Sequence, residues 1–400
     1  MSILEEIQNC PVEWKELGEV ALLKRGKTIT SKTATEGPYP VISGGQKPAY
    51  FHGEFNREGE TITVAGSGAY AGYVMYWDEP IFVSDAFSIE PLEGDLIPKF
   101  LYYYLLEKQE TLFSLKKGSG VPHVYPKDVS KILIPIPPLE IQEKIVQILD
   151  KMTEYVTELT SELTSRKKQY TFYQDKLLSF EAEVYQVEWK TIQDISVKIV
   201  TGVTPKKSCE DYYLKGTIPW LRTNEVKFNT ITTTEKYVTE KAVEETGLKW
   251  IVPNSIIIAI SGATAGRVAM NSIPLTTNQH CCSISVDERI VNYKYLYYWL
   301  VNQNRQILSL KQGARGDINM SMIKSFKIPV PSLEIQSRIV QVLDNFDMVC
   351  NDLNIGLPKE IELRQKQYEY FREKLLTFLA EGEYTDSTVQ YSTDKTSLGS

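Results

Sequence analysis

The fold is decided by a proline-rich stretch that occurs twice in the chain. Its first copy reads Ile134-Pro-Ile-Pro-Pro-Leu-Glu-Ile-Gln-Glu-Lys-Ile-Val-Gln-Ile-Leu-Asp150, and 194 residues later it returns as Ile328-Pro-Val-Pro-Ser-Leu-Glu-Ile-Gln-Ser-Arg-Ile-Val-Gln-Val-Leu-Asp344. Proline favours an extended backbone and is accepted in the first turn of a helix. Each copy therefore predicts a strand that ends where a helix begins, and two copies indicate an internal repeat.

The repeat extends on both sides of this stretch. Four further pairs of segments match, and in chain order they are Val12–Lys15 with Val187–Lys190, Gly68–Gly72 with Gly262–Gly266, Lys99–Leu105 with Lys294–Leu300, and Asp175–Leu178 with Glu373–Leu376. Each half also alternates β-branched runs with glycine-rich turns and contains an aromatic-rich helix. These features predict an α+β fold in which two mixed α/β domains alternate with two long helices.

The helices are amphipathic and carry a coiled-coil pattern. Apolar residues recur in steps of four and three from Ile141 to Leu159, and a further step of four to Leu163 is a stutter that resets the phase. The second helix repeats the pattern but is broken at Gly356 and Pro358. Two such helices bury their apolar seams most simply against each other. The alternative is an ordinary helical hairpin in a core, although such helices are usually about half this length.

These signals divide the chain into five segments. Residues 1–139 and 187–333 are expected to form two globular domains, and residues 140–186 and 334–383 two helices. Residues 384–400 are rich in serine and threonine and are expected to form a flexible tail.

Composition narrows the class of protein. A chain of 400 residues is too long for one ordinary core, and its formal charge of −7 is not that of a uniformly basic protein. Any contact with DNA phosphates is therefore expected from local basic patches. The five cysteines contain no Cys-x-x-Cys pair, which favours a reduced, cytoplasmic protein. No secretory signal is expected in the acidic segment Met1–Leu17, and no membrane span in Trp250–Gly266, which Pro253 interrupts.

The repeated segments together resemble the specificity subunits of type I restriction-modification systems. The resemblance rests on the duplicated Ile-Pro-x-Pro-x-Leu-Glu-Ile-Gln segment that leads into a long helix, on the Lys-Leu-Leu close of each helix and on Val-Glu-Trp-Lys at the start of each half. It covers residues 12–382. It implies that the globular domains are target-recognition domains, that each reads one half of a split double-stranded DNA target, and that the helices pair antiparallel as a coiled-coil spacer.

The resemblance also implies partners and cofactors. Two modification subunits are expected to dock alongside the chain, to bind S-adenosylmethionine and to methylate adenine. Restriction subunits are expected to add translocation and cleavage with ATP and Mg²⁺. This chain itself is expected to hold no cofactor and no metal, and to be non-catalytic.

The first candidate DNA-binding segments are basic and follow the Val-Glu-Trp-Lys motif of each half. A basic loop with glycine lies along phosphates by its charge and its exposed backbone amides. The candidates are Lys24, Arg25, Lys27, Thr28 and Lys32 in the first half, and Lys206 and Lys207 in the second. The alternative is a solvated loop without a ligand.

The next pair of loops carries side chains that suit base edges. Glutamine and asparagine pair with adenine, and arginine or lysine with guanine. The candidates are Gln46 and Lys47 in the first half, and Arg222, Thr223 and Asn224 in the second. Each of them is also an ordinary surface residue in the alternative interpretation.

The glycine-rich turns and a last basic loop complete the candidates. The turns at Gly66–Gly72 and Ser261–Gly266 lack the lysine and helix start of a nucleotide-binding loop, so they are either structural or direct Tyr70 and Arg267 toward a groove. The last basic loop of each half contributes Lys116, Lys117 and His123, or Lys311, Arg315 and Asn319.

The sequence also favours particular interpretations over their rivals. His280-Cys281-Cys282 is expected to belong to a core and not to a metal site, because no further ligands cluster with it. No methyltransferase motif and no G-x-x-x-x-G-K-[ST] loop occurs. A fused restriction-methylation enzyme is therefore disfavoured. A helical scaffold without DNA recognition remains the alternative function.

Overall fold

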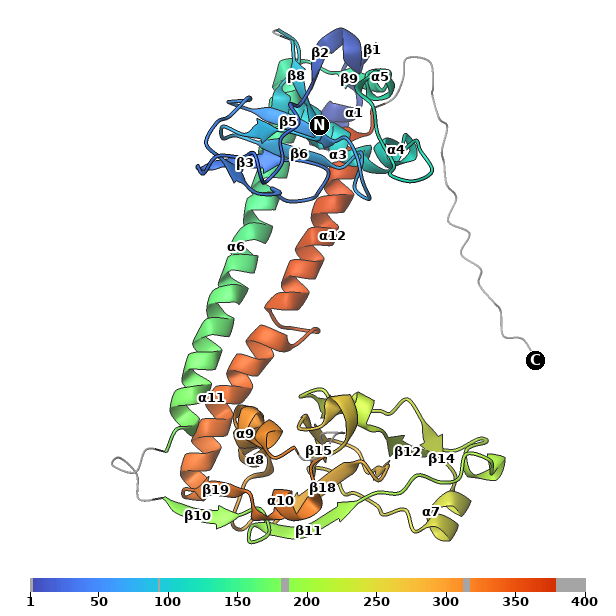
Figure 1. The fold of residues 1–400 in the computed structure, drawn as a ribbon, viewed down its shortest axis with the longest axis vertical. Helices are drawn as coiled ribbons and strands as arrows, with labels where there is room; N and C mark the ends of the chain where they lie inside the picture. The colour runs from blue at the N-terminus through green and yellow to red at the C-terminus, as the bar shows by residue number, and fades with distance from the viewer. Residues whose placement is uncertain (1–2, 93, 181–186, 312–316, 379–400) are drawn as a thin grey trace, which may run out of the picture. The chain divides into compact units, whose positions relative to one another are not determined.

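The computed structural model describes residues 3–92, 94–180, 187–311 and 317–378 (Figure 1). The chain forms two compact units. Of the described residues, those within 3–159 and 361–378 form the first unit, and those within 160–360 form the second. Each unit thus combines one globular half with parts of the long helices.

The first unit is built on a four-stranded and a three-stranded sheet. The strand orders are β2-β8-β5-β6 and β4-β3-β7, and β1 pairs separately with β9. The strands are β1 (Glu13–Glu16), β2 (Ala21–Arg25), β3 (Tyr39–Ile42), β4 (Phe51–His52), β5 (Thr61–Ala65), β6 (Val74–Trp77), β7 (Phe82–Val83), β8 (Ala86–Pro91) and β9 (Leu133–Ile136). The helices of the globular part are α1 (Ile3–Gln8), α2 (Leu17–Val20), α3 (Pro98–Glu107), α4 (Gln109–Ser114) and α5 (Pro126–Val129).

The core of the first unit lies between the larger sheet and α3. Every residue of β5 is buried, as expected for a β-branched strand in the middle of a sheet. The apolar side of α3 contributes Phe100, Leu101 and Leu105, none of which is exposed.

The second unit repeats this plan with a larger sheet. Its strand orders are β11-β18-β15-β16-β13 and β14-β12-β17, and β10 pairs separately with β19. The strands are β10 (Glu188–Thr191), β11 (Ser196–Thr201), β12 (Ile218–Leu221), β13 (Thr230–Ile231), β14 (Tyr237–Val238), β15 (Ile256–Ala259), β16 (Val268–Asn271), β17 (Thr276–Thr277), β18 (Cys281–Val286) and β19 (Lys327–Val330). The helices are α7 (Glu240–Thr246), α8 (Tyr293–Asn302), α9 (Asn304–Ser309) and α10 (Met320–Ser325), with 3₁₀ turns η1 (Glu210–Tyr212), η2 (Thr223–Glu225) and η3 (Gly262–Thr264).

The duplicated proline-rich stretch has the structure that its sequence predicts. Each copy is a strand, β9 or β19, that leads directly into a long helix. The two strands pair antiparallel with β1 and β10 in the same register, so that Trp14 faces Pro135 and Trp189 faces Pro329. The internal repeat is therefore structural as well as sequential.

A buried glutamine joins each long helix to its globular half. The Gln142 side chain accepts a hydrogen bond from Ile97 N at 2.9 Å and donates to Asp95 O at 2.7 Å and Pro137 O at 2.8 Å. Its side chain is fully buried. Because Ile97 is the N-cap of α3, this glutamine fixes the start of α3 against the start of the long helix.

The second unit has the same joint. The Gln336 side chain accepts from Asn292 N at 2.8 Å and donates to Ile290 O at 3.1 Å and Pro331 O at 2.8 Å. Gln336 is also fully buried, and Asn292 is the N-cap of α8.

A second contact lies two turns along each helix. In the first unit, the Asp150 carboxylate accepts from Tyr103 Oη at 2.5 Å and pairs with Lys99 Nζ at 2.8 Å. The second unit has the same contacts. Its Asp344 carboxylate accepts a hydrogen bond from Tyr298 Oη at 2.7 Å and pairs with Lys294 Nζ at 2.6 Å. Each helix is therefore attached to its globular half at two points.

The long helices pair antiparallel within each unit. The helix α6 (Leu139–Leu178) is continuous over 40 residues, which corresponds to about 60 Å. The second helix consists of two pieces, α11 (Leu333–Asn351) and α12 (Leu357–Leu376). The chain turns between them, and the Asp352 side chain accepts a hydrogen bond from Asn354 N at 2.7 Å. Gly356 lies so close to α11 in this turn that a Cβ would come within 2.5 Å of Met348 O. Of the two residues at which the sequence predicts the break, Gly356 lies in the interruption, whereas Pro358 is the second residue of α12.

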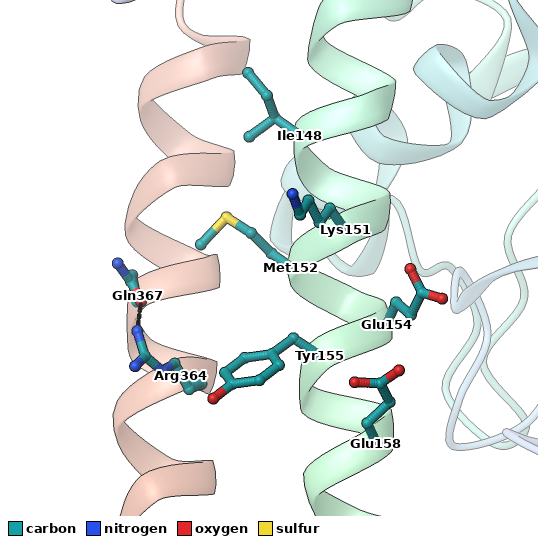
Figure 2. Close-up of a pocket in the computed structure, with 8 residues that line it drawn as sticks. All are labelled: Ile148, Lys151, Met152, Glu154, Tyr155, Glu158, Arg364 and Gln367. Carbon is teal, nitrogen blue, oxygen red and sulfur yellow. Dashed lines mark hydrogen bonds between the residues drawn. The ribbon is translucent and has the colours of Figure 1, made fainter.

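In the first unit, α6 lies beside α12 and encloses a cavity of about 530 Å³ (Figure 2). Ile148 and Met152 project into it from α6, and the Arg364 guanidinium lies 5.3 Å from the centre of the Tyr155 ring. In the second unit, α6 lies beside α11, where Tyr170 and Tyr173 both stack on Phe346. The apolar seam is thus used in both units.

Candidate nucleic-acid interface

The basic segment after β2 and the segment after β11 are held at corresponding places. A Cβ at Gly26 would lie 2.2 Å from Ser84 O, and one at Gly202 would lie 1.8 Å from Thr277 O. Only glycine permits so close an approach of two backbones. Each basic segment is therefore anchored against the short strand, β7 or β17, that precedes the next loop.

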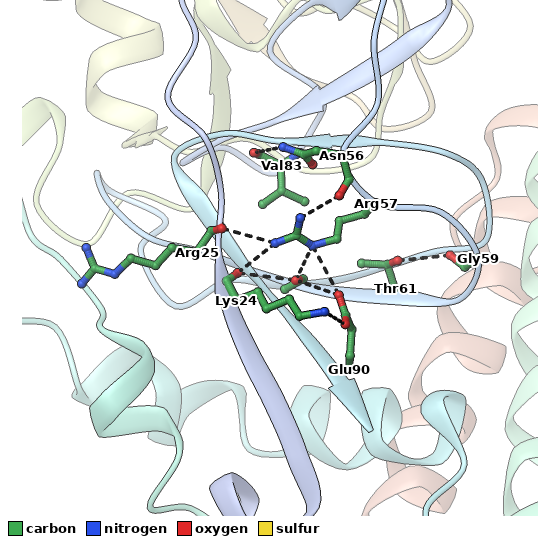
Figure 3. A network of polar contacts seen from close by, with 9 residues as sticks. Lys24, Arg25, Asn56, Arg57, Gly59, Thr61, Val83 and Glu90 are labelled. Carbon is green, nitrogen blue, oxygen red and sulfur yellow. Dashed lines mark hydrogen bonds and ion pairs between the residues drawn. The ribbon is translucent and has the colours of Figure 1, made fainter. Parts of the chain in front are cut away.

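A network around Arg57 fixes the end of β2 (Figure 3). The Arg57 guanidinium donates to Ser88 Oγ at 2.7 Å and to the backbone oxygens of Lys24 at 3.4 Å and Arg25 at 3.2 Å. It also pairs with Glu90 at 3.4 Å. Sequence reasoning did not single out Arg57. An isolated arginine in a turn carries no signal of this role, because its partners lie on two distant strands.

The cations of the first basic segment differ in whether they form an ion pair with an acidic side chain. The Lys24 ammonium pairs with Glu90 at 2.5 Å, so its charge is partly neutralised. The Arg25 side chain extends away from the network and lies 5.7 Å from the centre of the Tyr125 ring (Figure 3). Lys27 and Lys32 are exposed and make no ion pair with any described residue.

Three of the predicted segments meet around a small cavity in the first unit. Its volume is about 130 Å³. The basic segment, the glycine-rich turn and the last basic loop all contribute to its lining, which includes Arg25, Thr28, Gly66, Asp85, His123 and Tyr125. The structure thus brings together side chains that are up to about 100 residues apart in the sequence.

The glycine-rich turn and the last basic loop are joined directly. The Lys116 ammonium donates to Ala69 O at 2.9 Å, and the neighbouring Tyr70 side chain is 45% exposed. Lys117 pairs with Asp128 at 2.8 Å. Both lysines therefore already have partners, whereas the Tyr70 side chain is exposed.

The loop with Gln46 and Lys47 lies next to the same turn. A Cβ at Gly44 would lie 2.4 Å from Ser67 O, which shows how closely the two loops approach. Gln46 and Lys47 are both exposed. All four predicted segments of the first unit therefore border one surface.

In the second unit, the predicted base-reading residues are engaged with acids. The Arg222 guanidinium pairs with Glu235 at 2.5 Å, and the Asn224 amide donates to the same carboxylate at 3.3 Å. The buried Glu225 carboxylate accepts from Arg222 N at 3.1 Å, with Thr223 between the two residues. Contact of Arg222 with a base therefore requires exchange of its bond to Glu235.

The other predicted cations of the second unit differ in exposure. Lys206 and Lys207 are exposed and make no ion pair with any residue that the structure describes. Arg267 and Lys311 are half-buried. Arg315 lies outside the described residues.

The last loops of the two units match in a way that the sequence did not reveal. The sequence places His123 after the last basic loop of the first half and Asn319 after that of the second. In the structure, however, Asn319 is the N-cap of α10, as Tyr125 is of α5. Asp317 therefore occupies the place of His123, and its carboxylate accepts a hydrogen bond from Ser261 Oγ at 2.6 Å.

The His-Cys-Cys segment lies at the sheet core. Cys281 and Cys282 are fully buried on β18, whereas His280 is exposed. Burial raises the pKa of both thiols, that of Cys282 to about 12, so they stay protonated and are poor metal ligands. Among the described residues, no group of three or more histidine, cysteine or acidic side chains is placed to hold a metal ion.

Two residues at corresponding places in the two units were not among the candidates predicted from the sequence. Asp85 lines the cavity of the first unit, and Gln279 lies in the matching segment of the second. The repeat itself contains the signal, because Phe82–Asp85 aligns with Thr276–Gln279 at the same offset of 194 as the proline-rich stretch. Neither residue is basic, which is why a search for basic loops passed over them.

Comparison with known proteins gives a consistent result. Residues 11–166 and 186–363 each match the family described as "Type I restriction modification DNA specificity domain". The chain is 39% identical over 401 residues to the type I restriction enzyme EcoR124I/EcoR124II specificity subunit of Escherichia coli, which covers 94% of this chain and 97% of that protein. It is 31% identical to a putative type I restriction enzyme specificity subunit of Haemophilus influenzae, over 93% of this chain and 97% of that one.

Solved structures show the same fold. The type I restriction-modification S subunit of M. genitalium superposes with a TM-score of 0.64 at 20% identity, and the alignment covers 93% of this chain and 98% of that one. This likeness concerns the fold alone. No helix among the described residues combines the length and the apolar character needed to cross a membrane.

Proposed function

The chain belongs to the family of type I restriction-modification specificity subunits, which are non-catalytic, and from this we propose that it binds double-stranded DNA and reads a bipartite target. Each globular half reads one half-site. The α6 helix and the α11–α12 pair act as the spacer between the two readings. The adenine methylation and the restriction that follow are carried out by partner subunits.

One observation supports this proposal above the others. In both units a basic segment is anchored at a glycine, Gly26 or Gly202. At each of them a neighbouring backbone comes so close that a side chain would not fit. Exposed cations follow each glycine, Lys27 and Lys32 in the first unit and Lys206 and Lys207 in the second. Two equally constructed basic segments in one acidic chain suit two separate contacts with phosphate backbones.

The partners follow from the same family. We propose that two modification subunits dock along the paired helices, where the cavity in Figure 2 exposes Tyr155 beside Arg364. S-adenosylmethionine would be held by those subunits, and ATP and Mg²⁺ by restriction subunits. A reducing, cytoplasmic setting suits the five cysteines, all of which are free.

A domain exchange tests the proposal. Residues 187–333 are replaced with those of another family member, and the chain is expressed with its modification subunits. Methylome sequencing is expected to show a bipartite motif in which only one half-site has changed. A change in both half-sites would contradict the assignment of one half-site to each unit.

A gel-shift titration with competitor DNA addresses the alternative function. It uses the chain together with its modification subunit and DNA that carries the methylated motif. The complex is expected to prefer this DNA at every salt concentration that permits binding. Absence of any sequence preference would favour a helical scaffold instead.

A further inference from the structure

The segment after β7 places an acidic side chain in the middle of the predicted DNA-binding surface. Asp85 lines the 130 Å³ cavity together with Arg25, Thr28 and His123. Its carboxylate accepts a hydrogen bond from Ser67 Oγ, and its side chain is exposed. An exposed acid at this place is unexpected on a surface that faces phosphates, because like charges repel.

The backbone holds Asp85 in a fixed position from three sides. Ser84 N donates to Ile42 O at 2.8 Å, and Gly66 N donates to Asp85 O at 3.1 Å. On the third side Gly26 packs against Ser84, where a Cβ would come within 2.2 Å of the backbone oxygen. The carboxylate is therefore presented by a rigid support and not by a free loop.

The carboxylate has unused acceptor capacity. An ionised carboxyl group accepts about four hydrogen bonds and donates none. Ser67 supplies one, and no cation among the described residues pairs with Asp85. When DNA covers this surface, the remaining acceptor sites of the carboxylate are satisfied only by a hydrogen-bond donor of the DNA. Phosphate and sugar oxygens of DNA offer none, whereas the exocyclic amines of bases do.

From these observations we propose that Asp85 is a base-reading residue of the first unit, which accepts a hydrogen bond from the N4 amine of a cytosine in the major groove. This inference rests on the proposed function. Cytosine is the base whose major-groove edge presents only a donor, and aspartate is a side chain that matches it.

The second unit carries a different side chain at the corresponding place. Asn278 N donates to Leu221 O at 3.0 Å, which is the counterpart of the bond from Ser84 to Ile42. Gln279 therefore follows the short strand β17 as Asp85 follows β7. Its side-chain oxygen accepts from Thr204 Oγ1. Glutamine suits the N6 and N7 atoms of adenine, so the two units are expected to prefer different bases at this contact.

The test replaces the two side chains in the full chain, expressed with its modification subunits. D85N retains the shape and the bond to Ser67 but removes the charge. Methylome sequencing and selection of bound DNA from a library randomised in both half-sites are expected to show one position of one half-site losing its preference for cytosine by about tenfold or more. The other half-site is expected to stay unchanged.

Two further variants complete the test. Glu79→Gln is the matched control, since Glu79 is an exposed acid of the same unit that lies outside the cavity, and its motif is expected to equal that of the natural chain. Q279E is expected to shift one position of the second half-site from adenine toward cytosine. It also keeps the proposal testable if D85N does not fold, as judged by thermal unfolding.

The outcomes separate the two proposals. An unchanged motif in both D85N and Q279E, or equal weakening at all bases in a folded variant, would overturn the role of Asp85 while leaving the proposed function intact. If the natural chain itself produced no sequence preference with its partners, the proposed function would fail instead.

Discussion

Gln142 and Gln336 make the same three hydrogen bonds in the two halves of the chain, whereas the loops that carry the predicted DNA contacts differ between the halves. In the first unit Ser67 donates to Asp85, on the segment after β7. In the second, the corresponding Ser261 donates to Asp317, on the loop before α10.

This contrast shows which parts of the chain have to match. The contacts of Gln142 and Gln336 fix the orientation of each globular half relative to its long helix. If these contacts differed, the two halves would be oriented differently on their helices. A loop that reads a base has no such constraint. It needs a fixed support but a variable side chain, since the two half-sites differ.

The largest effect is expected at the joints. Gln142→Ala removes three hydrogen bonds of a fully buried side chain and leaves backbone groups without partners. The free energy of unfolding is expected to fall by about 2–4 kcal/mol, measured by urea denaturation. Gln336→Ala is expected to cost the same within about 1 kcal/mol, because its three bonds are equivalent.

Matched controls exist one turn and a half further along each helix. Gln147 and Gln341 are exposed and are separated by the same offset of 194 residues. Their replacement by alanine is expected to change stability by less than about 0.5 kcal/mol. If Gln142→Ala behaved like Gln147→Ala, the joint would not be a structural attachment, and the comparison above would lose its first half.

A smaller and more selective effect is expected in the loops. Arg222→Ala is expected to relax one base position of the second half-site by about 1–3 kcal/mol, measured as the loss of discrimination in binding titrations. The structure sharpens this prediction, because Arg222 pairs with Glu235 in the unbound chain. Glu235→Gln removes that competition and is expected to tighten binding to the natural site without changing its sequence.

Lys206→Ala is the control for a contact that carries no sequence information. Lys206 is exposed and has no ion pair among the described residues, so it suits a phosphate. Its loss is expected to weaken binding to all sequences alike. The slope of the logarithm of the binding constant against the logarithm of the salt concentration is expected to decrease in magnitude by about one. Equal behaviour of Arg222→Ala and Lys206→Ala would contradict the assignment of Arg222 to a base.

The sequence predicted the repeated architecture well because it depends on periodicity and on proline. The strand-to-helix junctions and the break at Gly356 are local patterns, and the structure contains both of them. The candidate site was less accessible to such reasoning. The acidic partners of Arg222 and Lys24 lie 13 and 66 residues away in the sequence. No local sequence pattern indicates that these two side chains form ion pairs.

The correspondence between the two last loops could not be predicted from the sequence for a related reason. Both residues follow a basic loop in the sequence, but asparagine is also a preferred N-cap residue, whose side chain accepts a backbone hydrogen bond. Asn319 fulfils that role at α10, and the matching position in the first unit is Tyr125. Only the start of a short helix, which spacing does not define, reveals the correct match with Asp317.

The last prediction concerns the spacer, where the change in affinity is expected to be smallest. Thr157-Glu-Leu-Thr160 is followed by Ser161-Glu-Leu-Thr164, a tandem repeat within the continuous helix α6. Four residues advance a helix by about 6 Å and turn it by only about 40° beyond one full turn. Deletion of residues 161–164 should therefore shorten the helix with little rotation.

The structure adds a reason why this deletion is tolerable. In the second unit, the Tyr170 ring of α6 stacks on the Phe346 ring of α11, and this contact defines the register of the two helices. Because the helices run antiparallel, residues 161–164 then face the interruption after Asn351 and not a continuous helical partner. The deletion also removes the ion pair from Glu162 to Arg166, an exposed pair worth less than about 1 kcal/mol.

If α6 determines the separation of the two readings, the deletion is expected to shorten the unread gap by about one to two base pairs, at an axial rise of about 3.4 Å per pair. Both half-sites are expected to stay the same, since neither joint and no loop is altered. Methylome sequencing of the deletion variant measures both quantities at once. An unchanged gap with full methylation would show that residues 161–164 do not measure distance, and altered half-site bases would show that helix and loops are not independent parts. In that case the contrast between matching joints and varying loops would have to be abandoned, because the helix itself would contribute to base reading.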